Sequence, residues 1–342
     1  MLQSSPPKRL PISLLRKAAS AAVQSVPSER ARLIASLVFE WYLGPEWIQQ
    51  LNTSTSRQLN TSTSRPFLFR KPIGRENLLH EFNRLINLGE MLFNLRDIDG
   101  IGEVVGQLHD QQIELAFAQL EVGRILAAHG IKFHFVGPYG GNRNCGLELI
   151  FPQGVVAARS GIISKIGLRE FRCKPVEEGL SRAGNQLTTD TPGVIFVRVP
   201  DEWLRTDEML RNRYMANPHG DPSSIRFQLG DVARSFVRQH RHVVLVEFYS
   251  DQLWFGGKTM TTATRGLEIE SVVHQFDQMK GWGLLTASTH DGSGAPNWWI
   301  SLSALAGGKL DNELKLDRLI PKDHLYVYTM EPPVPNWPCN DP

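Results

Sequence analysis

The sequence has little cysteine and no hydrophobic run long enough to cross a membrane. Its three cysteines, Cys145, Cys173 and Cys339, lie far apart and none belongs to a CxxC pair. This spacing argues against a zinc ribbon or a disulfide-stapled secreted domain, and it favours free thiols in a reducing compartment. Apolar stretches such as 243–249 are too short to span a bilayer, and the N-terminal stretch lacks the apolar core of a secretion signal. We therefore expect a cytoplasmic protein without a membrane partner.

The chain also lacks a strong charge of either sign. Its formal net charge is only +2, which provides no overall attraction to nucleic acid, although a local basic cleft remains compatible with it. Hydrophobic residues make up 41% and charged residues 21% of the chain, which is typical of a folded protein. A chain of 342 residues accommodates one large domain or two of ordinary size.

Residues 1–109 are predicted to form a helical N-terminal region. Apolar residues recur at helical spacing over 29–42, where Ser28 is a candidate N-cap, and again over 73–110. Between these segments, Gln50–Arg57 (QLNTSTSR) is repeated without change as Gln58–Arg65. Because its Ser, Thr and Asn side chains cannot form a core, residues 50–65 are predicted to be a flexible, solvated loop.

Residues 110–250 are predicted to form an α/β core. Its first part contains one helix, three closely spaced strands, a second helix and a fourth strand. These elements are expected at 110–130, 131–136, 145–151, 155 onward, 174–187 and 193–199. A further helix at 225–239 and a buried strand at 242–249 follow, and residues 251–342 are interpreted as a mixed C-terminal extension packed on the core.

Two acids are placed where this order of elements makes them informative. Glu121 lies on the first predicted helix, nine residues before Gly130, and Glu148 lies on the second predicted strand. With the αβββαβ order, these residues make the segment 110–200 similar to the PD-(D/E)XK nuclease superfamily, which has a restriction-endonuclease-like fold. The resemblance implies a mixed sheet flanked by helices.

The resemblance also implies a magnesium site, in which hard oxygen ligands hold the ion beside a scissile phosphate. In this resemblance Glu121 and Glu148 correspond to the metal ligands, and Lys165 corresponds to the lysine near the attacking water. The match is incomplete, since Gly146 stands where the family has an aspartate. Arg159 and Gly161 stand where the acid and the lysine of the third strand belong. We therefore expect a degenerate catalytic motif.

The same residues also have simpler interpretations. Glu121 can be a solvated helix acid, Glu148 a surface acid and Lys165 a solvent-exposed lysine. Arg143, in the glycine-rich loop 137–144, and Arg159 are candidates for binding nucleic-acid phosphates. Alternatively, Arg159 pairs with Glu148 or Glu121, so that a salt bridge replaces the metal site.

Three functions follow from these interpretations. The leading one is a catalytically degenerate nuclease-fold protein that binds nucleic acid or acts as a scaffold. The second is an active, divergent endonuclease that uses Mg²⁺ to hydrolyse phosphodiester bonds. The third is a protein-interaction module of an unrelated α/β fold, whose element order matches that of the nuclease core by chance.

Overall fold

The computed structural model describes residues 9–22, 25, 27–47, 49, 77–110, 112–128, 131–137, 146–151, 154–162, 171–199, 203, 225–250, 254–255, 262–263 and 267–273. The repeat at 50–65, Arg143 and Lys165 lie outside these residues. The chain divides into two compact units, of which the first comprises Met1–Leu120 with Glu313–Pro342 and the second comprises Glu121–Asn312. Among the described helices, none combines the length and the apolar character needed to cross a membrane.

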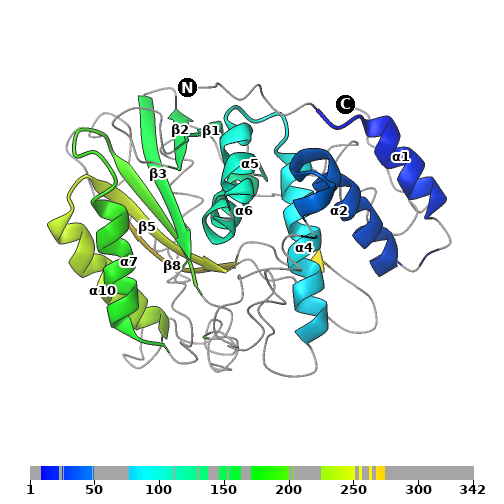
Figure 1. The fold of residues 1–342 in the computed structure, drawn as a ribbon. Coiled ribbons are helices and arrows are strands. Elements are labelled where there is room, and N and C mark those ends of the chain that lie inside the picture. Colours follow the sequence, from blue (N-terminus) through cyan, green and yellow to red (C-terminus); the bar gives the residue numbers. More distant parts are fainter. Residues whose placement is uncertain are drawn as a thin grey trace, which may run out of the picture. The chain divides into compact units, whose positions relative to one another are not determined.

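The described residues of the first unit form helices, as predicted for the N-terminal region (Figure 1). Its helices are α1 (Ile12–Ala21), α2 (Pro27–Leu43), α4 (Asn77–Asn94), α5 (Ile101–His109) and the beginning of α6 (Ile113–Ala128). Helix α2 already begins at Pro27, so Ser28 lies in its first turn and the predicted cap at Ser28 is wrong. Proline suits that first position because its missing N–H has no partner there in any helix.

A glycine allows α2 and α4 to approach closely. A Cβ atom added to Gly89 would lie 3.1 Å from the Cβ atom of Ala35. Apolar side chains from both helices are fully buried, among them Val38 from α2 and Met91 from α4. Farther along, the indole nitrogen of Trp47 donates a 3.1 Å hydrogen bond to the carbonyl of Leu108. The first unit therefore has its own apolar core.

The second unit contains a mixed β-sheet. Among the described residues, six strands pair in the order β1-β2-β3-β4-β5-β8. They are β1 (Phe133–Phe135), β2 (Leu147–Phe151), β3 (Gly154–Ile162), β4 (Gly193–Arg198), β5 (Val243–Ser250) and β8 (Leu267–Val273). The β3–β4 and β4–β5 pairs are parallel, and the other pairs are antiparallel. A separate two-stranded sheet is formed by β6 (Trp254–Phe255) and β7 (Thr262–Ala263).

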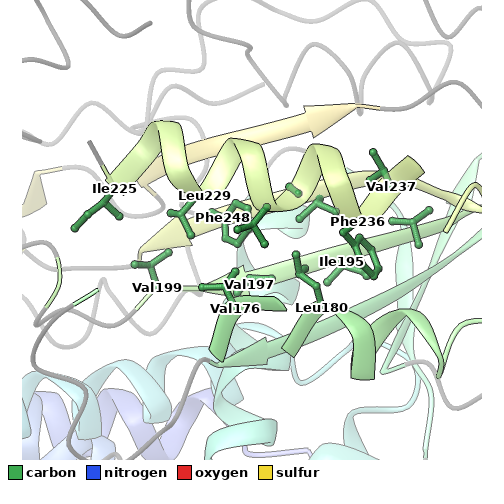
Figure 2. Close-up of a cluster of buried hydrophobic side chains, with 14 of the residues drawn as sticks. Val176, Leu180, Ile195, Val197, Val199, Ile225, Leu229, Phe236, Val237 and Phe248 are labelled. Atoms are coloured by element: carbon green, nitrogen blue, oxygen red, sulfur yellow. The ribbon is translucent and has the colours of Figure 1, made fainter. Parts of the chain in front are cut away.

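Two helices cover one face of this sheet, α7 (Cys173–Gly184) and α10 (Ile225–Gln239) (Figures 1 and 2). Each connects two parallel strands, as a crossover helix must. Figure 2 shows Val176 and Leu180 of α7 and Leu229 and Phe236 of α10 directed toward the sheet. We call this side the α7/α10 face. Its strand residues include Ala157, Ile195, Val197, Val199, Val243, Val246 and Phe248.

Residues 121–128 of α6 lie on the opposite side, which we call the α6 face. A Cβ atom added to Gly123 would lie 2.8 Å from the ring of Phe135 and 3.2 Å from that of Phe133. Leu147 and Leu149 of β2 are paired with these phenylalanines and are fully buried. Neighbouring residues in register share a face of a sheet, so this side of β1 and β2 is apolar.

The predicted arrangement of an α/β fold with a mixed sheet flanked by helices is confirmed. The elements follow one another as α6, β1, β2, β3, α7 and β4, which is the predicted order. Helix α10 also has the predicted bounds. The periodic spacing of apolar residues in the sequence therefore identified the helices and strands that hold the candidate site.

Candidate functional site

Glu121 is held by an arginine from the middle of the sheet. The Nε atom of Arg198, in β4, lies 3.0 Å from both carboxylate oxygens of Glu121. The Glu121 side chain is 1% exposed and that of Arg198 is 2% exposed. A carboxylate removed from water needs such a partner, because burial of an unpaired charge costs several kcal/mol. The predicted exposed positions of Glu121, in solvent or in an open metal site, are therefore wrong.

Further polar groups surround this ion pair. The hydroxyl of Tyr249, in β5, donates a 3.3 Å hydrogen bond to Oε2 of Glu121. Burial raises the pKa of Tyr249 well above its ordinary value, and the neighbouring Glu121 charge raises it further. Arg124 of α6 and Glu247 of β5 are also buried on this side of the sheet. We call Glu121, Arg124, Arg198, Glu247 and Tyr249 the buried polar cluster.

The buried polar cluster is suited to holding structure rather than to catalysis. It combines two acids with two arginines, so its formal charges balance. A magnesium ligand needs a carboxylate oxygen that can reach the metal, whereas both oxygens of Glu121 contact Arg198. The ion pair instead connects α6 to the centre of the sheet.

Glu148 lies in a different environment. Its carboxylate is 2.9 Å from the Nε2 atom of His134 on β1, and the two side chains are 12% and 32% exposed. His134 and Glu148 are direct partners in the antiparallel register of β1 and β2. A carboxylate that contacts one ring nitrogen of an imidazole fixes the orientation of the ring, as in many acid–base pairs. Sequence reasoning missed His134.

The two predicted metal ligands are on opposite faces of the sheet. Glu148 is in register with Ala157, which belongs to the core on the α7/α10 face. Glu121 contacts Arg198, whose neighbours Val197 and Val199 point into that same core, so Arg198 itself points to the α6 face. The prediction that Glu121 and Glu148 converge on one pocket is therefore wrong.

Arg159 shares a face with Glu148 but not with Glu121. It lies two residues after Ala157 on β3 and is in register with Ile195, so it belongs to the α7/α10 face. It is partly buried. The predicted pairing of Glu121 with an arginine does occur, but the arginine is Arg198 rather than Arg159. The predicted roles of Lys165 and Arg143 fall outside the described residues.

The magnesium prediction does not fit this geometry. Among the described residues, no group of three His, Cys, Asp or Glu side chains gathers to hold a metal ion. Glu121 and Glu148 cannot bind one ion from opposite sides of a sheet, whose thickness with its side chains is about 10 Å. Comparison with known proteins adds no assignment, since no family model, no curated protein and no solved structure matches this chain.

Proposed function

We propose that this chain is a catalytically degenerate protein with a restriction-endonuclease-like core, and that it acts by binding nucleic acid rather than by cleaving it. The αβββαβ order of the second unit supports the fold assignment. The main support for a loss of cleavage activity is the ion pair between Glu121 and Arg198. The helix acid that would assist a metal is used to hold α6 on the sheet.

The residues of the second and third strands agree with this proposal. Glu148 contacts His134 on the face opposite to Glu121. Arg159 stands on β3 where an acid would be needed, and an arginine repels a metal ion rather than binding it. This face therefore carries the His134–Glu148 pair and a partly buried arginine, and its two basic side chains suit phosphate better than magnesium.

The test is a cleavage assay combined with a binding assay on the full chain. Supercoiled plasmid, linear DNA and RNA would each be incubated with the protein and Mg²⁺ or Mn²⁺. Fluorescence anisotropy with labelled oligonucleotides would measure binding in parallel. We expect binding that weakens as salt is raised, because phosphate contacts release counterions, and no cleavage.

A Glu148→Ala variant distinguishes a real activity from a contaminant. Divalent-ion-dependent cleavage that is lost in this variant would show an active nuclease and overturn the proposal. Cleavage that is equal in both proteins comes from a contaminant. Absence of binding to DNA and RNA would also overturn the proposal, and would leave the protein-interaction module as the surviving alternative.

A further inference from the structure

Three exposed arginines lie near the ends of α7 and α10. Arg182 lies in the last turn of α7, Arg238 lies in the last turn of α10, and Arg241 follows in the connection to β5. Their side chains are exposed. We call Arg182, Arg238 and Arg241 the basic edge.

Tight packing brings the two helix ends together. A Cβ atom added to Gly184 would lie 2.7 Å from the ring of Phe236 and 3.0 Å from that of His240. The ring of His240 stacks on Phe236 with centroids 4.3 Å apart, and the carbonyl of Gly184 is 3.4 Å from Nε2 of His242. Arg182 is two residues before Gly184, Arg238 is two after Phe236 and Arg241 is one after His240, so each arginine lies within one turn of this junction along the chain, on the outer side of the helices.

The acids nearest to the basic edge in sequence do not pair with its arginines. In the described part of the chain, none of its arginines forms an ion pair. By contrast, Arg234 on the same helix contacts Asp231 at 2.9 Å. Glu178 lies one turn before Arg182 on α7 but forms no ion pair with it, and Asp190, which follows α7, accepts a hydrogen bond from Thr189. Exposed arginines without acidic partners leave a positive surface potential that attracts anions.

The helix dipole explains the positions of only some of the arginines in the basic edge. A basic residue in the last turn interacts favourably with the carbonyl end of its helix, by about 0.3–1 kcal/mol. That effect accounts for one arginine in each helix. It does not account for Arg241, which lies beyond the end of α10. Arginine also binds phosphate with two parallel hydrogen bonds, which lysine cannot do.

We propose that the basic edge binds the phosphodiester backbone of a nucleic acid without reading its sequence. This inference rests on the proposed function and names the surface that would perform it. Backbone contacts made by exposed arginines carry no base information, so DNA and RNA share the chemistry recognised here. Labelled duplex DNA, single-stranded DNA and RNA of one length would show which form binds best.

The experiment compares two variants of the full chain that lose the same formal charge. The first is Arg182→Gln with Arg238→Gln and Arg241→Gln. The matched control is Lys132→Gln with Arg172→Gln and Lys174→Gln, which alters exposed basic residues just before β1 and at the beginning of α7. Anisotropy titrations at salt concentrations from about 50 to 200 mM would give both the affinity and its salt dependence.

We expect the first variant to lose on the order of 100-fold in affinity for duplex DNA at low salt, and its logarithmic salt slope to fall by about 2 to 3. The control should change affinity by less than about 3-fold, because removal of distant charges acts only through a screened field. A third variant with lysine at all three positions of the basic edge should retain most of the binding and also tests folding of the altered surface.

The outcomes separate the two proposals. If wild-type protein binds and the basic-edge variant binds equally well, the basic edge is not the surface, while the proposed function stands. Equal losses in the variant and its control would mean that net charge alone matters, and would also overturn the assignment of the surface. If wild-type protein binds neither DNA nor RNA, both proposals fail.

Discussion

Arg198 and Glu121 form a buried ion pair across 77 residues of sequence, with the Nε atom of Arg198 at 3.0 Å from Glu121. The pair connects the central strand β4 to α6, and Tyr249 completes it from β5. It gives the second unit a polar centre within an otherwise apolar layer.

Removal of one partner of this pair should destabilise the protein strongly. Glu121→Leu leaves the Arg198 charge buried without its carboxylate, which typically costs about 3–5 kcal/mol. The double variant Glu121→Leu with Arg198→Met removes both charges and should recover most of that loss. Urea unfolding followed by circular dichroism measures each change, and a single variant as stable as wild type would contradict a structural role for the pair.

Tyr249→Phe should weaken the same cluster by a smaller amount. The substitution removes one hydrogen bond to a charged acceptor, which is worth about 1.5–3 kcal/mol, and preserves the ring. Tyr42 offers a matched control, since its buried hydroxyl accepts from the neutral backbone N–H of Leu10 at 3.3 Å. Tyr42→Phe should cost about 0.5–1.5 kcal/mol. A loss for Tyr249→Phe no larger than that for Tyr42→Phe would argue against the contact with Glu121.

Two glycines in α7 should respond to alanine in opposite directions. At Gly184 the new methyl group would lie 2.7 Å from the Phe236 ring, and relief of this overlap should cost about 1–3 kcal/mol. At Gly179 nothing lies within 4 Å of the new atom, so Gly179→Ala should stabilise the helix by about 0.5–1 kcal/mol. Thermal unfolding of the two variants checks the packing of α7 against α10, and a stabilising Gly184→Ala would contradict it.

Acid should weaken the fold through His242. Burial lowers the pKa of His242 from its ordinary value of 6.5, and the nearby His240 lowers it further. The unfolded chain therefore binds more protons than the native protein in the range just below pH 6.5. The stability contributed by neutral His242 is complete above this pH and is lost as the pH falls toward the lowered native pKa.

Unfolding measured over this pH range in wild type and His242→Gln gives the test. The slope of stability against pH should be smaller in the variant. Equal slopes in wild type and His242→Gln would show that another group is responsible.

The elements of this protein were predictable because their patterns are local. The apolar spacing over 225–239 matches α10 without error, and the run at 193–199 matches β4 within one residue. Helices and strands of this kind depend on residues that are close in sequence. The spacing of the apolar residues is therefore enough to predict them.

The site was not predictable in the same way, because its partners are distant in sequence. Glu121 meets Arg198 and Tyr249 only after β3, β4 and β5 have paired, and Tyr249 is 128 residues away. The six residues of β4 are all buried, so no alternation of polar and apolar residues indicates which face Arg198 occupies.

One signal for the placement of Glu148 was present in the sequence. Leu147 and Leu149 alternate with Glu148, and Phe133 and Phe135 alternate with His134. A helix that packs on β1 and β2 must cover their apolar side, which puts Glu148 on the other side. That reasoning separates Glu121 from Glu148 and would have argued against a shared metal.

The position of β4 between β3 and β5 also matters while the chain is being synthesised. β3 precedes it, but β5 follows only after α10, so β4 leaves the ribosome with one of its two hydrogen-bonding edges unmatched. A strand with six buried residues is a ready template for pairing with another nascent chain. Ribosome stalling or truncation between residues 200 and 240 should therefore produce aggregates, and a chaperone that shields β4 over this interval would raise the yield of folded protein.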